Sequence, residues 1–486
     1  MGKLNHLNPT QVWENFEALC NIPRPSKKEE KVIKFMKEFG EKLGLKTIVD
    51  EVGNVIIKKP ATKGMENRQG IILQGHIDMV PQKNSDKVHD FEKDPIVPWV
   101  DGDWVKATGT TLGADNGLGV SATMAILQSK DIAHGPIEAL LTIDEETGMT
   151  GAFGLKPGLL DGDILLNLDS EDEGELYVGC AGGIDASIKF NYKEEAVPAN
   201  HTAYKLSLTG LKGGHSGLEI ILYRGNSNKL MNRFLKFASK QFNVRISSIE
   251  GGSLRNAIPR ESFVTVVVPN NNEAEFLKAV SNYEKIYRKE FSDCDPDIKL
   301  VAEKTSAPNS VFDLKTQNEL INTIYSCPNG VIRMSDSMKG MVETSTNLAI
   351  VKSNNGTILI ACLLRSSVDS AKDDLVEAIH SNFALSSADI KFEGGYPGWK
   401  PNMNSAILKT AGEVYKKKFG KVPEIKAIHA GLECGLLGGV YPNLDMLSFG
   451  PTIRYPHSPD EKALIPSVQK FWDFLVEVIK NAPLKK

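Results

Sequence analysis

The chain has 486 residues, 41% of them hydrophobic and 24% charged, with a formal net charge of -4. This composition is typical of a soluble globular protein, and the length exceeds one ordinary hydrophobic core, so we expect two or three domains. The small net charge gives no reason to expect nucleic acid or an anionic membrane as a partner. No run of about 18 apolar residues is present, so we expect no membrane-spanning helix.

The start of the sequence favours the cytoplasm, and the cysteines indicate reduced thiols. Residues 1–6 contain no apolar signal-peptide core. The six cysteines are scattered without a CxxC pair, so neither a disulfide framework nor a thiolate zinc site is expected. We therefore predict reduced thiols that are mostly buried.

The chain begins with local signals for helices and a hairpin. Residues 9–19 carry apolar side chains at helical spacing, and Ser26 with Glu29 matches a capping box ahead of a second helix. Residues 47–58 read as a hairpin that turns at Gly53-Asn54. A buried strand is predicted next, at residues 71–73.

Four apolar strands each lead into Asp, Glu or His. The four stretches, each a strand with the polar residues that follow it, are 71–78, 137–148, 164–171 and 444–457. Because open α/β sheets build their sites at the carboxyl ends of strands, we expect these polar side chains to meet. Several carboxylates and imidazoles at one sheet edge indicate a metal site.

A glycine-rich turn at residues 108–117 precedes a helix that runs through residues 120–127. Such turns can bind phosphate, but this one has neither GxGxxG nor a Lys-Ser/Thr pair. We therefore expect its glycines to let the backbone bring Asp115 close to the other polar residues.

After Gly182-Gly183 the sequence shows short alternating strands separated by helices, and the earlier pattern returns near residue 393. We predict an α/β fold with a mixed-sheet catalytic domain, discontinuous in sequence, built from residues 1–182 and 393–486. An α+β lid domain, residues 183–392, is inserted into it. Within the lid, a strand followed by a helix occurs at 256–287 and again from 347 onward, so we predict an internal repeat with halves at about 183–300 and 301–392.

Five side chains in these segments have the chemistry of a two-metal site: His76, Asp115, Glu146, Asp169 and His457. Nitrogen and oxygen donors without thiolate suit Zn²⁺, Mn²⁺ or Co²⁺. Two ions need about three ligands each, so five residues suffice if one carboxylate bridges, and Asp115 is the candidate. Adjacent side chains on an extended segment point apart, so we expect Glu145 to stay free for proton transfer in metal-assisted hydrolysis.

Each of these residues has a plainer interpretation by itself. A lone His at a strand end is usually hydrogen-bonded within a loop, and Glu145-Glu146 alone is more often a solvated turn. Asp169 and Glu171 alone are compatible with helix caps. Their joint occurrence at strand ends favours the metal site.

The motifs resemble those of the M20 family of di-metal peptidases, and within it the aminoacyl-histidine dipeptidase branch. The matching segments are 75–80, 110–119, 144–151, 167–175, 213–217 and 456–461. The resemblance implies a zinc-peptidase-like catalytic domain that holds two divalent ions. It implies one ion on His76, Asp115 and Asp169, and a second on Asp115, Glu146 and His457.

The same resemblance implies further roles beside the metals. Asp78 would support the His76 imidazole, and Glu145 would act as general base and then acid. A cis peptide is implied at Asp115-Asn116.

In the lid, the resemblance implies that His215 stabilises the oxyanion. It also implies that an Arg after an Asn-strand motif holds the substrate carboxylate. Arg365, preceded by Asn347, matches that place, so we predict both as substrate-binding residues. A doubled lid could place His215 and Arg365 over the metals of the same chain. We therefore expect activity without exchange of residues between subunits, although a homodimer is implied by resemblance.

These expectations combine into a cytoplasmic metallodipeptidase with two divalent ions, zinc by preference and cobalt or manganese as alternatives. Its substrate would be an unblocked dipeptide, favouring Xaa-His with β-alanyl-histidine included. The alternative on the same scaffold is an N-acyl amino acid deacylase or aminoacylase. A metal-free binding protein would require a missing ligand, and none is missing.

Overall fold

The computed structural model describes residues 4–485 and divides into two compact units. The first comprises Met1–Gly179, Pro401–Ala427 and Leu432–Lys486, and the second comprises Cys180–Lys400 and Ile428–Gly431. Residues 1–3, part of the segment used above to argue against a signal peptide, and residue 486 lie outside the described part. The second unit thus interrupts the first in sequence, at Cys180–Lys400, where a lid was expected at 183–392, and the short segment Ile428–Gly431 also belongs to it.

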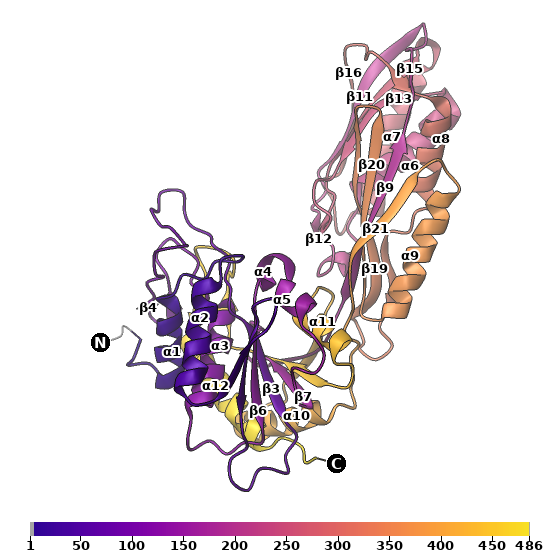
Figure 1. Ribbon diagram of the computed structural model, residues 1–486. Helices are drawn as coiled ribbons and strands as arrows, with labels where there is room; N and C mark the ends of the chain where they lie inside the picture. The colour runs from indigo at the N-terminus through magenta and orange to yellow at the C-terminus, as the bar shows by residue number, and fades with distance from the viewer. Residues whose placement is uncertain (1–3, 486) are drawn as a thin grey trace. The chain divides into compact units, whose positions relative to one another are not determined.

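The first unit is built on an eight-stranded sheet of order β1-β2-β6-β3-β7-β23-β8-β22 (Figure 1). Its strands are β1 Lys46–Val49, β2 Val55–Lys59, β3 Ile71–His76, β6 Ile137–Thr142, β7 Ile164–Asn167, β8 Glu175–Cys180, β22 Glu424–Ile428 and β23 Asp445–Ser448. The central strands β6, β3, β7 and β23 run parallel, whereas β1 and β2 are antiparallel. Every residue of β3, β6 and β7 is buried, which explains why most of their residues are apolar.

Helices cover this sheet and confirm the expected mixed α/β fold. They are α1 Thr10–Cys20, α2 Glu30–Lys42, α3 Ala114–Gln128, α4 Glu145–Gly148, α5 Thr150–Gly154, α10 Ala406–Phe419, α11 Glu433–Val440 and α12 Ile465–Lys480. α3 packs on β3, and α1 packs on α3 with Val12, Trp13 and Phe16 buried (Figure 1). The predicted apolar face of the first helix is therefore the face it buries.

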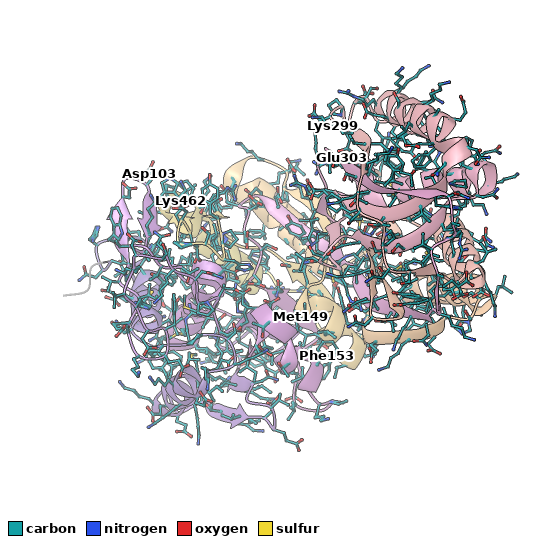
Figure 2. The ribbon with its side chains drawn as sticks, turned by 90° about the horizontal axis from the view of Figure 1, so that it is seen from above. Asp103, Met149, Phe153, Lys299, Glu303 and Lys462 are labelled. Carbon is teal, nitrogen blue, oxygen red and sulfur yellow. The ribbon has the colours of Figure 1, made fainter. Side chains whose placement is uncertain are left out.

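A small four-stranded sheet joins distant parts of the first unit. It consists of β4 Trp99–Asp101, β5 Trp104–Lys106, β24 Ile453–Arg454 and β25 Lys462–Leu464, in the order β24-β25-β5-β4. The Lys462 ammonium lies 4.4 Å from the centre of the Trp104 ring, and Figure 2 shows Lys462 near Asp103 at this sheet. The pairing of β24 with β25 and of β25 with β5 holds the loop that carries His457.

The capping box expected at Ser26 and Glu29 is absent. α2 begins at Glu30, and Glu29 makes no side-chain cap. The Ser26 hydroxyl instead donates to Asp78 Oδ2 at 2.7 Å, and Glu29 Oε1 accepts from the Asp144 amide at 3.1 Å. Both side chains therefore hold the polar loops that follow β3 and β6.

The second unit contains a nine-stranded sheet of order β16-β11-β15-β13-β19-β20-β9-β21, with β18 paired to β19. The strands are β9 Gly182–Asn191, β11 His201–Thr209, β13 Arg245–Gly251, β15 Ser262–Pro269, β16 Lys299–Lys304, β18 Gly330–Met334, β19 Val342–Asn354, β20 Thr357–Ser366 and β21 Asp389–Tyr396. Helices α6 Ser227–Phe242, α7 Glu273–Glu290, α8 Leu314–Ser326 and α9 Asp369–Ala384 share one hydrophobic core with it. Small pairs β10 Glu194–Glu195 with β17 Val311–Phe312, and β12 Gly214–His215 with β14 Ala257–Ile258, complete the unit.

The second unit consists of two similar halves. One runs β11-α6-β13-β15-α7-β16 and the other β9-α8-β19-β20-α9-β21, and in both the first strand lies between the third and the fourth. The halves join edge to edge through β13 and β19. Because β9 precedes the whole first half, the halves are nested in sequence, which differs from the expected consecutive division near residue 300.

Other features of the described residues agree with the sequence. The edge strand β16 exposes Lys299 and Glu303 (Figure 2), charges that discourage pairing with another chain. Five of the six cysteines are buried and Cys294 is half-buried. Within residues 4–485, none of the helices has both the length and the apolar character to cross a membrane.

Candidate metal centre and active site

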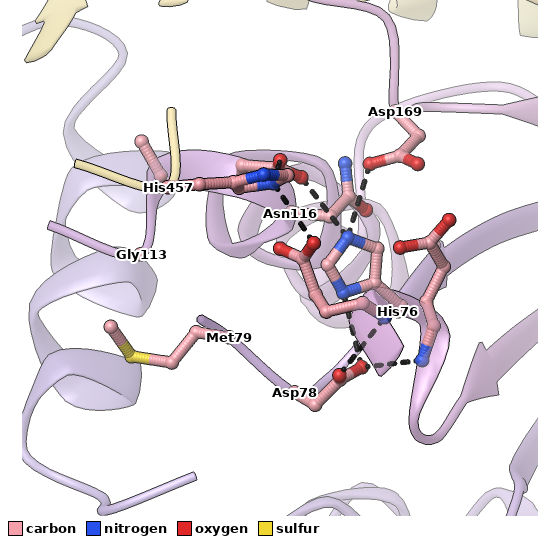
Figure 3. Close-up of polar contacts among 12 residues, drawn as sticks. His76, Asp78, Met79, Gly113, Asn116, Asp169 and His457 are labelled. Atoms are coloured by element: carbon pink, nitrogen blue, oxygen red, sulfur yellow. Dashed lines mark hydrogen bonds and ion pairs between the residues drawn. The ribbon is translucent and has the colours of Figure 1, made fainter. Parts of the chain in front are cut away.

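His76 is the last residue of β3, and its side chain is 1% exposed. Its Nε2 lies 3.0 Å from Asp115 Oδ1 and 3.3 Å from Asp169 Oδ1 (Figure 3). Asp115 stands at the start of α3, and Asp169 lies two residues beyond the end of β7. These three residues, from three separate elements, therefore present one ligand atom each to a common point.

His457 completes a second set. Its Nε2 lies 2.9 Å from Glu146 Oε2 and 3.2 Å from Asp115 Oδ2. The two oxygens of Asp115 thus face different histidines, which is the geometry of a bridging carboxylate. In each set the ligand atoms lie within 4.8 Å of one another. The structure brings all five predicted metal ligands together.

The peptide between Asp115 and Asn116 is cis, as the resemblance implied. His457 lies in the loop between β24 and β25 with φ at 59°. A non-glycine residue in this left-handed region is uncommon, and such residues gather at functional sites. The pairing of β25 with β5 holds this loop in place.

The electrostatics of the cluster fit positively charged ligands. Burial, with added repulsion from neighbouring carboxylates, raises the pKa of Asp169 to about 7 and that of Glu171 to about 8. Hydrogen bonds to Asp115 and Glu146 raise the pKa of His457 to about 11. Glu146 Oε1 is buried without a hydrogen-bond partner among the described residues. The cluster therefore has an excess of negative charge, which divalent cations would neutralise.

Asp78 connects the histidine to the next loop. Its Oδ1 lies 3.2 Å from His76 Nδ1 and accepts from the Glu145 amide at 3.1 Å. Its Oδ2 accepts from the Glu146 amide at 3.3 Å. Burial opposes the charge on Asp78, but His76 outweighs it and lowers the pKa of the carboxyl. One carboxylate therefore orients the imidazole and fixes the start of α4.

The segment that carries Glu145 and Glu146 is helical, so the expected extended conformation is wrong. α4 is a single turn between Asp144 and Met149, which both have left-handed backbone. Consecutive side chains of a helix point about 100° apart, so the two carboxylates still diverge. His76, Glu145 and Glu146 also lie within ligand range of one another. Burial, reinforced by neighbouring carboxylates, raises the pKa of Glu145 well above its usual value, which suits a proton carrier.

Glu461 is a functional residue that sequence reasoning missed. It is 2% exposed, and its two oxygens accept four successive backbone N–H groups, those of Leu112 at 2.7 Å, Gly113 at 2.9 Å, Ala114 at 2.8 Å and Asp115 at 3.2 Å. The side chain thus holds the loop that carries the bridging aspartate. Glu461 ends the motif at 456–461, whose His457 alone had been interpreted.

Arg24 holds the same loop from the other side. Its guanidinium donates to the carbonyls of Gly113 at 2.6 Å, Asp78 at 2.7 Å and Ile77 at 3.1 Å. A Cβ on Gly113, which has φ at 71°, would lie 2.7 Å from Arg24 Nη2. Arg24 therefore ties the Asp115 loop to the end of β3, and glycine is needed where they meet.

Glu433 is a second buried carboxylate that the sequence did not reveal. It opens α11 and is 1% exposed. Its Oε2 accepts from Gln74 Nε2 at 2.6 Å and Thr142 Oγ1 at 2.8 Å. It lies close enough to His76 for the two charges to interact.

His215 lies in β12 of the second unit, and its hydrogen bonds determine which ring nitrogen carries the proton. Its Nδ1 accepts the backbone N–H groups of Gly217 at 3.1 Å and Leu218 at 3.0 Å. An accepting Nδ1 places the ring proton on Nε2. Burial and the positive charge of Arg365 lower the pKa of His215. The imidazole is therefore neutral at pH 7 and presents an Nε2–H donor.

Arg365, in β20, has unused donors. It is 6% exposed, its Nη1 donates to the Tyr396 hydroxyl at 3.3 Å, and its Nε has no hydrogen-bond partner among residues 4–485. His429, which the sequence did not single out, lies near it and bonds Ser345 Oγ at 2.7 Å. Burial, with added repulsion from Arg365 and His215, lowers the pKa of His429 to about 3. The charged Arg365, with two neutral imidazoles beside it, makes this part of the second unit suited to an anion.

Asn347 was expected to bind substrate, and in this structure its amide nitrogen is used within the second unit. It is 1% exposed, and its Nδ2 donates to the carbonyls of Arg255 at 3.2 Å and Ala257 at 2.8 Å. Ala257 pairs with His215 in the β12–β14 ladder. Asn347 therefore fixes the strand beside His215 and has no amide hydrogen left for a ligand.

A mixed sheet covered by helices, with two imidazoles and three carboxylates gathered beside the ends of its central strands, is typical of a metal-dependent hydrolase. The sequence pattern of Peptidase family M20/M25/M40 matches residues 72–481, and the chain belongs to this family. It is 46% identical over 485 residues to the cytosol non-specific dipeptidase of Escherichia coli (strain K12), with 100% of both chains covered. These matches confirm the family expected from the motifs.

Solved structures agree. The crystal structure of aminoacylhistidine dipeptidase from Vibrio alginolyticus matches with a TM-score of 0.96 and 48% identity, covering 100% of this chain and 99% of that one. Aminopeptidase PepT from Bacillus cereus ATCC 10987 has a TM-score of 0.58 at 16% identity, covering 98% and 99% of the two chains, and so shares the fold.

Proposed function

We propose that this protein is a metallodipeptidase that hydrolyses the peptide bond of unblocked dipeptides and favours Xaa-His, β-alanyl-histidine included. The observation that carries the proposal is Asp115, whose two oxygens face His76 and His457 at 3.0 and 3.2 Å. Family membership and the names of the relatives, a non-specific dipeptidase and an aminoacylhistidine dipeptidase, support the substrate class.

The two donor sets would hold two divalent cations. His76, Asp115 and Asp169 would bind one, and Asp115, Glu146 and His457 the other. Nitrogen and oxygen donors without thiolate suit zinc, and cobalt or manganese by the same preference. When bound, such cations lower the pKa of the attacking water and polarise the scissile carbonyl.

Glu145 would move the proton. Its carboxylate takes a proton from the water that attacks the carbonyl carbon. It then gives that proton to the amine nitrogen as the C–N bond breaks. A raised pKa brings the carboxyl closer to neutrality, where a group can both accept and release a proton.

The second unit would supply two further groups to the reaction. The Nε2–H of His215 donates to the oxygen that becomes negative in the tetrahedral transition state. The unused donors of Arg365 pair with the substrate carboxylate, which a guanidinium can bind through two hydrogen bonds. Because a dipeptide carries that carboxylate one residue from the scissile bond, such an anchor selects short substrates.

The remaining parts of the proposal concern location and assembly. A relative is named a cytosol dipeptidase, and we place this enzyme in the cytoplasm. We also propose a homodimer in which His215 and Arg365 serve the metal centre of their own chain.

The direct test measures metal content and hydrolysis of free and N-acetylated dipeptides. We expect two divalent ions per chain, loss of activity with a chelator and recovery with zinc or cobalt. Free dipeptides, above all Xaa-His, should be cleaved faster than their acetylated forms. Preference for the acetylated forms would support the aminoacylase instead. Full activity without bound ions would contradict metal-assisted hydrolysis.

A further inference from the structure

His215 lies on a loop, residues 212–225, whose two ends are close together. The Asp295 carboxylate joins them: its Oδ1 accepts from the Lys212 amide and its Oδ2 from the Gly225 amide, both at 2.7 Å. One side chain can contact both amides only because the two ends of the loop lie beside each other. This is the form of an Ω-loop, a compact surface loop of about 6–16 residues with adjacent ends.

Asp295 is itself fixed in the second unit. It is 0% exposed, and its amide donates to the Phe291 carbonyl at 2.8 Å, just after the end of α7. The thiol of the preceding residue, Cys294, lies 3.7 Å from the Tyr223 carbonyl, a third point of the loop. Burial of a carboxylate is unfavourable unless hydrogen bonds replace its water. The two loop amides provide these bonds, so the carboxylate and the loop stabilise each other.

Inside the loop, a second carboxylate holds the histidine. Glu219 Oε2 accepts from the His215 amide at 2.7 Å, and Glu219 Oε1 lies 2.9 Å from Arg224 Nη1. A Cβ on Gly214 would lie 2.5 Å from Glu219 Oε2 and 2.6 Å from Arg224 Nη1, so glycine is needed where these groups meet. His215 is therefore fixed within the loop, and the loop is attached to the rest of the unit through Asp295.

Hydrophobic packing contributes little to the position of this loop. Within residues 212–225, all of which the structure describes, Ile220 is the one buried large apolar side chain, and it packs with Ile258. Leu218, Leu222 and Tyr223 are 53%, 48% and 64% exposed. A pocket of about 370 Å³ lies against the end of the loop, and one of about 920 Å³ lies against its start. The hydrogen bonds to Asp295 are therefore the main attachment of the loop.

We propose that Asp295 is a positioning residue for His215: by joining the two ends of the loop, it fixes where the imidazole donor lies during the reaction. This inference rests on the proposed function, in which the Nε2–H of His215 donates to the developing oxyanion. Such a donor accelerates the reaction only if it is preorganised where the negative charge forms. A displacement of about 1 Å can lower the rate about 100-fold. Because Asp295 is fully buried, it touches no substrate and acts through His215.

The kinetic test is a double-mutant cycle between Asp295→Asn and His215→Ala. The asparagine keeps one acceptor but turns an NH₂ group toward the other loop amide. In the wild-type background it should lower kcat about 10- to 100-fold and change KM less than about threefold. In the His215→Ala background it should lower kcat less than about threefold, because the group that it positions is gone. Equal losses in both backgrounds would overturn the inference, because a general loss of stability acts in either.

Amide hydrogen exchange of the folded, metal-loaded proteins tests the attachment of the loop without using activity. Asp295→Asn should speed exchange in residues 212–225 and leave exchange in β11 and α6 unchanged. Asp293→Asn removes an exposed carboxylate two residues away and is the matched control, expected to equal wild type in kcat and in exchange. Exchange of the loop that stays at the wild-type rate in Asp295→Asn would refute the inference.

Two further variants keep the result interpretable. Asp295→Ser, whose hydroxyl still accepts one amide and leaves room for water, replaces the Asn variant if that variant does not fold, with the same expected results. His215→Ala alone tests the proposed function: a wild-type kcat in that variant would contradict the role of His215 in the reaction. Faster loop exchange in the Asp295 variant would then still support Asp295 as the residue that positions His215.

Discussion

The chemical role of a single residue in the site depends on the hydrogen bonds that fix its orientation. Asp78 is the clearest case. It lies 3.2 Å from His76 Nδ1 and accepts the amides of Glu145 and Glu146, so imidazole and base share one support. His215 has its Nδ1 occupied by two amides, which fixes the donor on Nε2. In both cases the hydrogen bonds to the backbone define the chemistry of the side chain.

The separation of base from ligand predicts the effect of Glu145→Gln. The amide cannot accept a proton from water, so kcat should fall about 10²- to 10⁴-fold. Metal content should remain that of the wild type, because Glu145 is not a proposed metal ligand. Its neighbour Glu146 is the one that faces His457. Kinetics and elemental analysis on the same preparation check this. A variant that loses an ion would show that Glu145 is a ligand.

His429 predicts a pH dependence of stability in the second unit. Burial lowers its pKa to about 3 from the ordinary 6.5. Between these values the unfolded chain binds a proton that the folded chain does not, so stability falls as pH drops below 6.5. The slope should be about 1.4 kcal/mol per pH unit. Urea unfolding of wild type and His429→Gln from pH 7 to 5 measures it. Equal slopes in the two proteins would contradict the assignment.

At the level of elements, the metal centre depends on loops held by buried charges. Glu461 accepts four successive amides of the loop that carries Asp115, and Arg24 donates to a carbonyl of the same loop. The N–H groups of four residues of this loop, 112 to 115, are satisfied by one buried carboxylate. The orientation of the bridging carboxylate therefore depends on residues that touch no metal.

Glu461→Gln should weaken metal binding and stability together. The amide turns an NH₂ group toward backbone N–H donors, leaving some of them without an acceptor. We expect a loss of roughly 2–4 kcal/mol in unfolding free energy. Metal competition with a chelator should show weaker retention than in Asp460→Asn, the exposed neighbour used as control. A variant that keeps both ions as tightly as wild type would contradict the positioning role.

Much of the site could be predicted because its strands are simple. β3, β6 and β7 are buried along their whole length, so their sequences are mostly apolar and the polar residues at and after their ends stand out. α4 could not be predicted, because four residues show no helical periodicity. Ser26 matched a capping box, but its hydroxyl bonds Asp78, a partner that only the tertiary fold brings near.

Two other features of the site have the same origin. Glu461 binds backbone amides some 350 residues earlier, and a backbone partner leaves no trace in the sequence. The two carbonyls that accept from the Asn347 amide are equally invisible in the sequence, from which only its place before Arg365 could be read. Long-range bonds to the main chain are thus the part of this site that a single sequence does not show.

For the molecule as a whole, the nested halves of the second unit bring two functional groups together. His215 lies in β12, within the first half, and Arg365 in β20 of the second. Arg365 contributes to the lowered pKa of His215, so the two side chains interact within one unit. One chain therefore contains both the donor and the carboxylate anchor of the proposed reaction.

The proposal that His215 and Arg365 serve the metal centre of their own chain predicts activity without exchange of residues between subunits. A mixture of His215→Ala and Glu145→Ala chains should then stay inactive, because each centre lacks one group of its own chain. Unfolding and refolding the mixture ensures that subunits exchange. Recovery of about a quarter of wild-type activity from an equal mixture would show that His215 acts on the partner's centre.

The central claim is that two cations share Asp115. Anomalous diffraction at the zinc edge, on crystals grown with zinc, tests it most directly. We predict two peaks on opposite sides of the Asp115 carboxylate, one beside His76 and Asp169 and the other beside Glu146 and His457. A single peak, or ions held by other residues while the enzyme is active, would contradict it.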